Sequence, residues 1–248
     1  MSYYIGTEAY RRRATMMGLL KTLMKLLASS IAQTKPSAVT EPLPDLLSVK
    51  NLRKVMSSKS YIFFDGNKKL NLNIIGVRRD NHGTNEFDDF LVVLYKNQNL
   101  KEECKVYSIT TDPGEHWLKN PLNPKGTAVL VPGQYRGTWK LGKHQNKYEA
   151  LVQAKPVKVW RDNNKDNIID YQGFNTLSEG YFGINIHRSN PYDKSYLVNK
   201  WSAGCQVFQS VKDYKEFLNI CKRSANLYGN SFTYTLLTEQ EIRKHLNN

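Results

Sequence analysis

From residue 61 onward, the chain alternates short apolar runs with turn residues, which predicts a β-rich domain. Runs of β-branched and aromatic residues bounded by Asp-Gly, Asn or Pro-Gly are typical of strands. Such runs occupy residues 61–66, 70–79, 90–95, 105–111, 127–139, 147–153, 157–161, 183–188 and 231–237. Their number and order predict a mostly β (α+β) fold, a sandwich or barrel-like domain over residues 61–248.

Two segments near the C-terminus have the period of helices instead. Ser210 and Asp213 form a capping-box pattern in its acidic variant. Apolar residues follow it at helical spacing, at positions 211, 214, 217, 218, 221 and 225. This predicts a helix beside the closing strand and a buried Cys221. A terminal helix over residues 238–246 is expected to begin with Thr238 as its cap.

The N-terminal pattern has two interpretations. Three arginines stand near the start of residues 10–32. Apolar residues then recur at helical spacing from Leu19 to Ile31, interrupted by Lys21 and Lys25. This predicts a basic amphipathic helix over residues 1–32, which would lie on an anionic membrane surface, dock on a larger assembly, or pack on its own domain. The other interpretation is a cleaved signal peptide. Residues 33–60, with three prolines, are predicted to be a linker.

The net charge favours an anionic partner but does not distinguish between the kinds of anionic partner. The chain of 248 residues has a formal net charge of +14, which favours an anionic partner such as nucleic acid, an acidic membrane or bacterial wall polymer. Residues 1–60 hold ten Lys or Arg and three Asp or Glu, and the rest hold twenty-six and nineteen. Each part therefore carries +7, and no basic stripe with interleaved aromatics gives a specific nucleic-acid signal.

Three cysteines, Cys104, Cys205 and Cys221, argue against a disulfide scaffold or a zinc site, because they leave an odd thiol and form no Cys/His cluster. Cys205 stands out among them. It follows Ser202 and Gly204, and the strand-like run ending at His187 precedes it by eighteen residues. It is either a small core residue or a nucleophile. A thiol needs an imidazole or backbone N–H groups nearby to act as a nucleophile.

The arrangement of His187 and the segment Ser202-Ala203-Gly204-Cys205 resembles the active-site signature of the YkuD-type L,D-transpeptidases. Residues 131–135, "VPGQY", are similar to an upstream segment of that family, and the resemblance covers residues 125–209. It implies a YkuD-like β-sandwich that acts on peptidoglycan stem peptides through a thioacyl-enzyme and requires no cofactor. Cys205 would be the nucleophile, His187 the base, Ser202 the group that orients the motif, and the N–H groups near Gly204 the oxyanion donors.

The chain departs from the family at two places. Gln206 and Val207 follow the cysteine, where the family has an apolar residue and then arginine. Arg188 follows the histidine, where the family has glycine. Arg188 is therefore a candidate for substrate binding from another direction, together with His144 and Trp201. His144 also has the plainer interpretation of a surface-loop histidine, and the tryptophans that of core or rim residues.

An acidic segment suggests calcium. Asp162, Asn164, Asp166 and Asp170 occupy the first, third, fifth and ninth positions of an EF-hand-like loop. Gly173 stands at the twelfth position, where the loop usually has glutamate. The alternative is a hairpin loop, because Asp and Asn also form turns.

Two classes of function follow from these features. The first is a cysteine-dependent enzyme acting at the bacterial cell wall, either a hydrolase or a transferase. Without a convincing signal peptide, a bacteriophage wall hydrolase delivered by lysis or in a virion fits best. The second is a catalytically weakened structural or wall-binding component, such as a virion protein attached through residues 10–32.

Overall fold

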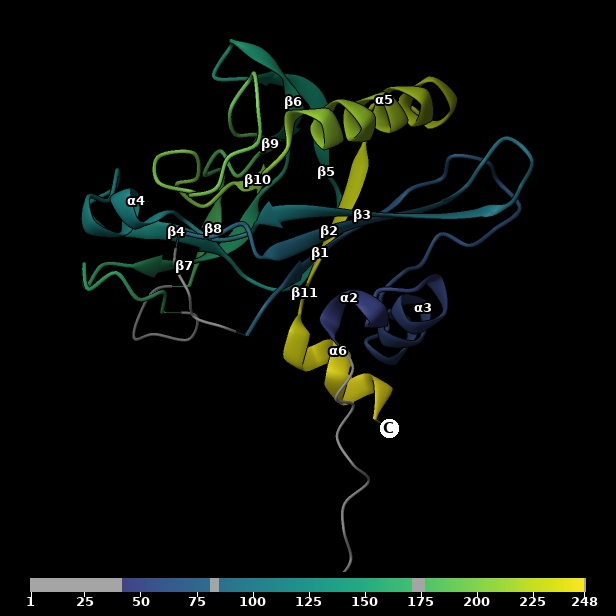
Figure 1. The fold of residues 1–248 in the computed structure, drawn as a ribbon, viewed down its shortest axis with the longest axis horizontal. Helices are drawn as coiled ribbons and strands as arrows, with labels where there is room; N and C mark the ends of the chain where they lie inside the picture. The colour runs from purple at the N-terminus through teal and green to yellow at the C-terminus, as the bar shows by residue number, and fades with distance from the viewer. Residues whose placement is uncertain (1–41, 81–84, 171–176, 248) are drawn as a thin grey trace, which may run out of the picture. The chain divides into compact units, whose positions relative to one another are not determined.

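Eight strands close into a barrel, and the fold is mostly β as predicted (Figure 1). The computed structural model describes residues 42–80, 85–170 and 177–247. The order around the barrel is β1-β11-β5-β6-β9-β10-β3-β2. The β1–β11 and β9–β10 pairs are parallel. The strands are β1 (Asn73–Arg78), β2 (Asp89–Lys96), β3 (Glu102–Thr110), β5 (Gly133–His144), β6 (Tyr148–Gln153), β9 (Ile186–Arg188), β10 (Gln206–Phe208) and β11 (Phe232–Thr238).

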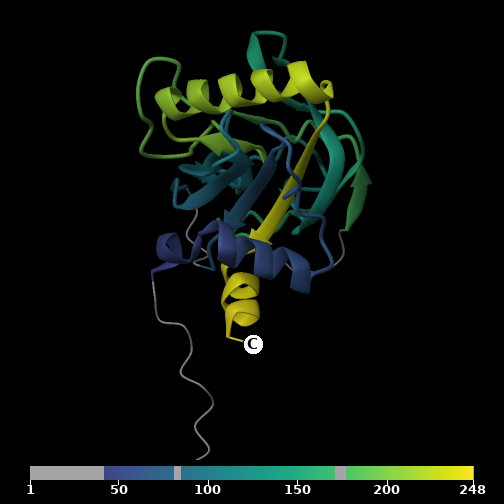
Figure 2. The same ribbon diagram turned by 90° about the vertical axis from the view of Figure 1, so that its right-hand side faces the viewer.

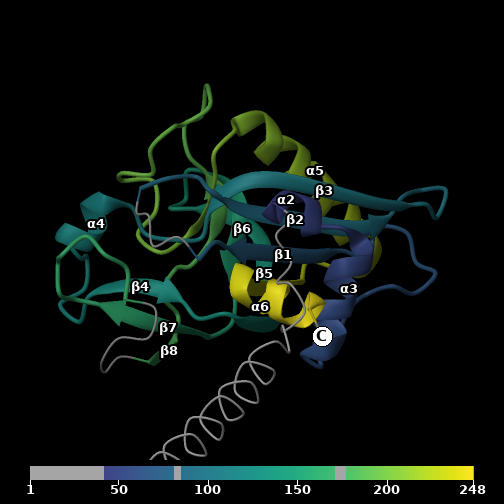
Figure 3. The same cartoon turned by 60° about the horizontal axis from the view of Figure 1, so that its bottom comes forward.

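A second, smaller sheet and five helices complete the described structure. The small sheet is antiparallel and contains β4 (Thr127–Leu130), β7 (Val157–Asp162) and β8 (Ser178–Gly180). Figure 3 shows these three strands together, away from α3 and α6. Figure 2 shows α5 on one side of the barrel and α3 with α6 on the opposite side. The helices are α2 (Leu43–Leu46), α3 (Val49–Ser58), α4 (Glu115–Lys119), α5 (Val211–Tyr228) and α6 (Glu239–Leu246).

The barrel interior holds the main core. Trp139 is fully buried there, and its Nε1 donates to the carbonyl of Ile184 at 2.8 Å. Phe208 on β10 packs against Phe217 on α5, with ring centroids 5.0 Å apart. Burying large side chains from both elements stabilises their contact, because each removes apolar surface from water. The barrel and α5 therefore form one apolar unit.

Both predicted C-terminal helices are confirmed with their caps. The Ser210 Oγ accepts from the N–H of Asp213 at 3.3 Å and begins α5. Thr238 and Glu241 exchange hydrogen bonds at the start of α6, at 3.1 and 2.9 Å. Each cap satisfies an N–H group that has no partner within its helix. Cys221 is fully buried on α5, as predicted.

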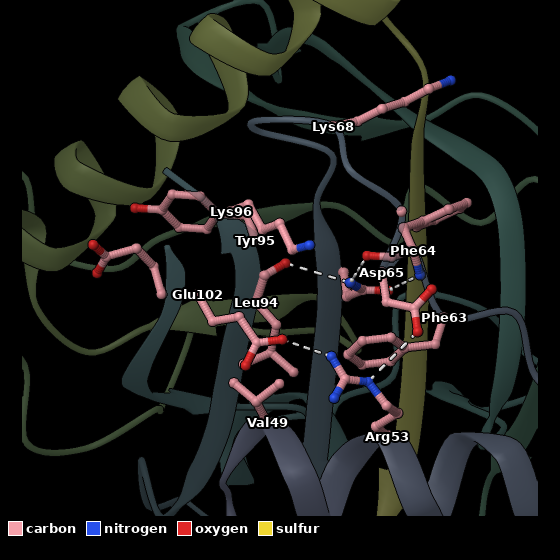
Figure 4. A pocket seen from close by; sticks show the side chains of 13 residues that line it. Val49, Arg53, Phe63, Phe64, Asp65, Lys68, Leu94, Tyr95, Lys96 and Glu102 are labelled. Carbon is pink, nitrogen blue, oxygen red and sulfur yellow. Dashed lines mark hydrogen bonds and ion pairs between the residues drawn. The ribbon is translucent and has the colours of Figure 1, made fainter. Parts of the chain in front are cut away.

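The strand predicted over residues 61–66 is wrong. Both edges of β1 are already paired, with β2 and with β11, so this segment has no strand to join. It runs as an extended loop instead. The Asn73 side chain accepts from the N–H of Phe64 at 2.8 Å and donates to its carbonyl at 3.0 Å. Arg53 bridges Glu102 at 2.7 Å and Asp65 at 3.6 Å beside a cavity of about 20 Å³ (Figure 4).

The linker predicted over residues 33–60 is wrong from residue 42 onward. Leu43 and Leu46 of α2 and Leu52 of α3 are buried. Pro44 lies in the first turn of α2, where the missing N–H of proline costs no hydrogen bond. Ser48 caps α3 by accepting from the N–H of Asn51 at 3.2 Å. The amphipathic helix predicted within residues 1–32 lies outside the described residues. Across the described ranges, none of the helices is long and apolar enough to cross a membrane.

A buried ion pair gives a stability prediction. Arg78 and Asp112 pair at 2.9 Å with side chains 2% and 8% exposed, whereas Lys222 and Glu149 pair at 2.7 Å with side chains 46% and 59% exposed. We expect Asp112→Asn to lower the free energy of unfolding by about 3 kcal/mol or more, because it leaves a buried guanidinium without its counter-charge. Glu149→Gln should lower it by less than about 1 kcal/mol. Urea denaturation measures both, and equal losses would contradict the expected dependence on burial.

Candidate active site

The parallel pair β9–β10 brings the two candidate residues together (Figure 1). Gln206 pairs with Ile186, and Val207 pairs with His187. The same register sets Cys205 opposite Asn185, and the N–H of Asn185 lies 3.5 Å from the cysteine sulfur. Because side chains alternate along a strand, Asn185 and His187 share one face. Cys205 and His187 are therefore diagonal neighbours on the outer face of the barrel.

The turn that carries the cysteine is built by its own residues. Ser202 Oγ donates to the Cys205 carbonyl at 2.8 Å and accepts from the N–H of Gly204 at 3.2 Å. Gly204 has a φ of +114°. A Cβ there would lie 2.1 Å from the carbonyl oxygen of Ala128 on β4. Only glycine fits both this conformation and this close approach.

Gln206 anchors the same turn inside the barrel. It is fully buried, and its Oε1 accepts from the Tyr234 hydroxyl at 2.7 Å. Its Nε2 lies 3.4 Å from the Gly204 carbonyl and 3.5 Å from that of Thr111. The departure from the family pattern at this position thus has a structural role. Val207, at the position of the family arginine, is also fully buried, in an apolar cluster that Cys205 contacts.

The thiol of Cys205 is neutral and partly exposed. It donates to the Gly183 carbonyl at 3.3 Å. Among the described residues, no hydrogen bond joins its sulfur to an imidazole. Burial raises the pKa of Cys205 to about 11. A preformed thiolate, as in proteases with a cysteine–histidine ion pair, is therefore not the resting state.

The hydrogen-bond partners of His187 assign its tautomer. Its Nδ1 lies 2.7 Å from the Arg188 carbonyl, which can only accept, so Nδ1 carries the proton. The Tyr148 hydroxyl lies 3.1 Å from the same nitrogen and 3.3 Å from the same carbonyl. The Nε2 atom then keeps a free lone pair. Burial, and after it the neighbouring His144, lowers the pKa of His187 to about 3.

His144 stacks on His187 and has the opposite tautomer. The ring centroids are 4.0 Å apart with 26° between the planes. Asn185 Oδ1 accepts from the N–H of Gln153 at 2.9 Å, so its Nδ2 faces His144 Nδ1, at 3.0 Å. His144 Nδ1 must accept, which leaves the proton on Nε2. Burial lowers the pKa of His144, followed by the nearby Lys147 and Arg188 charges, so the ring is neutral.

Cys205, Asn185 and His144 border a pocket of about 490 Å³, whereas the buried His187 stacks on His144 and is not itself among the lining residues. Cys205, Ala203, Asn185 and His144 line one side, while Arg161 of β7 and Phe182 line another. The Arg161 guanidinium lies 4.6 Å from the Phe182 ring centroid and donates to the Gly126 carbonyl at 3.2 Å. Its presence gives the pocket a fixed positive charge.

Two of the predicted substrate-binding residues lie elsewhere. Arg188 stacks 4.0 Å from the Tyr148 ring centroid and donates to the Ser189 carbonyl at 3.0 Å, so it does not line the pocket. Its guanidinium lies instead on the Tyr148 ring, whose hydroxyl is 3.1 Å from His187 Nδ1. Trp201 is 40% exposed and also lies outside the pocket lining. His144, the third of these residues, lines the pocket and is buried rather than a surface-loop residue.

Three residues of the site escaped the sequence analysis. Asn185 stands two residues before His187, and the strand period alone would have put both on one face. Tyr148 and Arg161 carry no local signal. The contacts of Tyr148 depend on how β6 meets β9, and those of Arg161 on how β7 meets Gly126 and Phe182. Of the four predicted calcium ligands, Asp162 ends β7, and Asn164, Asp166 and Asp170 lie in the loop that follows. Within the described residues, no three His, Cys, Asp or Glu side chains are arranged as ligands of one metal ion.

The burial of His187 gives a pH prediction. In the unfolded chain its pKa is about 6.5, and in the folded chain about 3. Between these values the unfolded state binds the extra proton, so stability falls as pH decreases from 6.5 towards 3. From this group alone, the free energy of unfolding should be about 2 kcal/mol lower at pH 5 than at pH 7. Urea denaturation at both pH values measures it. His187→Gln should reduce the difference, and an unchanged difference would contradict the assignment.

Comparison with known proteins gives no family for this chain: no family model, curated protein or solved structure matches it. The resemblance to the L,D-transpeptidases rests on the residues around His187 and Cys205. Function is therefore argued from the geometry of the pocket.

Proposed function

We propose that the protein is a cysteine-dependent enzyme that processes peptidoglycan stem peptides through a thioacyl intermediate, as L,D-transpeptidases do. One observation carries the proposal. Cys205 and the neutral His144 line one pocket, and His144 stacks on the neutral His187, which has the complementary tautomer. His187 offers a lone pair on Nε2, and His144 offers a proton on Nε2. A nucleophile, a base and a hydrogen-bond donor are the three parts that acyl transfer needs.

The first half-reaction forms the thioester. The Cys205 sulfur attacks the substrate carbonyl carbon while its proton passes to His187 Nε2. The carbon–nitrogen bond then breaks, and His187 returns the proton to the leaving amine. Since thiol and imidazole are both neutral at rest, the proton moves only as the sulfur attacks. Before the thiol attacks any electrophile, it must turn from the Gly183 carbonyl towards the imidazole.

The second half-reaction restores the thiol. Water or an amine attacks the thioester carbon and gives its proton to His187, which passes it to the departing sulfur. Water yields cleavage, and an amine yields a cross-link. The products of the reaction distinguish the two.

His144 is the preferred oxyanion donor. The N–H of Gly204, predicted for this role, is bonded to Ser202 Oγ instead. The Nε2–H of His144 has no partner among the described residues, and its ring lines the pocket. A preoriented neutral donor stabilises developing negative charge without reorganisation. Asn185 and His187 hold this ring from two directions.

Two features support peptidoglycan as the substrate: the positive charge of the pocket and the resemblance to L,D-transpeptidases. Arg161 lines the pocket, and no Asp or Glu is among its described lining residues. A peptide that carries a free carboxylate near the scissile bond fits this field. The net charge of +14 also favours an anionic polymer. A bacteriophage-type wall hydrolase, delivered by lysis or within a virion, remains the preferred setting.

One observation favours a second function. The raised pKa of Cys205 and its hydrogen bond to Gly183 describe an unactivated thiol. A structural or wall-binding component that has lost turnover would keep such a pocket.

Purified sacculi test the proposal. We expect the parent protein to release soluble peptides or to add cross-links, both read by mass spectrometry. Cys205→Ser should reduce the rate by about 10³-fold or more, because oxygen is a much weaker nucleophile here. His144→Phe keeps an aromatic ring against His187 but removes the donor. It should lower kcat by about 10²-fold with little change in KM.

Cys104→Ser is the matched control, because Cys104 is exposed near the start of β3 and is not among the residues that line the pocket. It should keep the parent rate. Unchanged sacculi with the parent protein would overturn the enzymatic proposal. Retention on sacculi by both the parent and Cys205→Ser, without products, would favour the binding function.

A further inference from the structure

The loop after β7 has the ligand spacing of a calcium site. Its residues close the loop on itself: the N–H of Asp166 donates to Asn164 Oδ1 at 3.2 Å, and that of Asp170 to Asp162 Oδ2 at 3.1 Å. Ile169 is buried and packs with Val129 of β4, which attaches the loop to the small sheet. The loop backbone is thus held in place from Asp162 to Asp170.

A buried oxygen in this loop has no partner. The Asp162 side chain is only 1% exposed, yet no described residue donates to its Oδ1. Its Oδ2 accepts from Asp170, so the carboxylate faces into the loop. Asn167 Oδ1 is also buried without a described partner. Buried carboxylate oxygens are costly unless they are bonded or coordinate a metal.

The acidic side chains near Asp162 also favour a bound cation. The carboxylates of Asp166 and Asp170 both contact one Asn164 amide nitrogen, and the N–H of Asp170 donates to Asp162, so the acidic groups lie close together. Asn164 Nδ2 donates to Asp166 Oδ2 at 3.0 Å and to Asp170 Oδ2 at 2.9 Å. These N–H groups occupy the place between the carboxylates where a positive charge is most stabilised.

We propose that residues 162–170 bind one calcium ion. The ligands are the side-chain oxygens of Asp162, Asn164 and Asp166, the backbone carbonyl of Ile168 at the seventh position, and Asp170 at the ninth, directly or through water. In the described structure the three carboxylates do not converge on one point. Binding draws them together and turns the Asn164 amide so that its oxygen replaces its N–H groups. Calcium accepts this irregular oxygen set, whereas magnesium requires a nearly octahedral one.

The site adjoins the pocket wall. Arg161, which lines the pocket, immediately precedes Asp162. A Cβ at the neighbouring pocket residue Gly126 would lie 2.1 Å from the Asp162 carbonyl oxygen, so β7 and this turn are in close contact. Calcium would therefore hold the side of the pocket that carries Arg161. The proposal does not depend on the reaction at Cys205.

Thermal unfolding of the full chain tests the site. In about 5 mM CaCl₂, above the range of weak calcium sites, the midpoint should rise by several degrees relative to EGTA. MgCl₂ at the same concentration should give a much smaller rise. Terbium luminescence, excited through Trp160 two residues before Asp162, should report binding directly and be displaced by calcium.

Three variants make the test specific. Asp162→Asn and Asp166→Asn should weaken terbium binding by more than about tenfold, since each removes a charged ligand. In EGTA, Asp162→Asn should be at least as stable as the parent, because it removes a buried, repelled charge. Asp193→Asn, at an exposed site elsewhere, should respond like the parent. No calcium-dependent midpoint in the parent, or an equal response in Asp162→Asn and Asp193→Asn, would overturn the proposal.

Discussion

The parallel pairing of β9 with β10 is the constraint on which the candidate site depends. Parallel neighbours cannot be joined by a tight turn, so the chain must cross back before Cys205 can lie beside the strand of His187. The register of this pair then determines which residues share a face. It sets Cys205 opposite Asn185, and His187 lies two residues further along the same strand face. A shift of one residue in the pairing of β9 with β10 would turn the His187 side chain into the barrel interior.

Buried polar groups keep this arrangement in a single state. The turn that carries Cys205 is held by two side chains. Gln206 accepts a hydrogen bond from Tyr234 inside the barrel, and Ser202 donates to the Cys205 carbonyl within the turn. On the outer face, the Arg188 carbonyl and the Asn185 amide give the two imidazoles opposite tautomers. Each of these groups would be costly if left without its partner, so the fold of the core and the protonation of the pocket are stabilised together.

Local patterns in the sequence predicted most helices and strands, but contacts between segments that are distant in the chain could not be predicted from it. The strand runs and the caps at Ser210 and Thr238 were readable because their signals lie within a few residues. The run at 61–66 has the composition of a strand, but β1 offers it no free edge. Prolines at 42 and 44 indicated a linker, although the first turn of a helix accepts them equally well. His144 was a candidate for the pocket, but its stacking on His187 could not be predicted, since that depends on β5 and β6 closing the barrel next to β9.

The central claim is that His187 activates Cys205, and alkylation of the intact protein tests it most directly. Iodoacetamide labelling at pH 7.5 is followed by mass spectrometry, with Cys104 and Cys221 as internal references. The account predicts that Cys205 reacts faster than the buried Cys221, and that His187→Ala slows Cys205 by about tenfold or more while Cys104 keeps its rate. Equal rates at Cys205 with and without the imidazole would contradict it and leave the thiol as a packing residue.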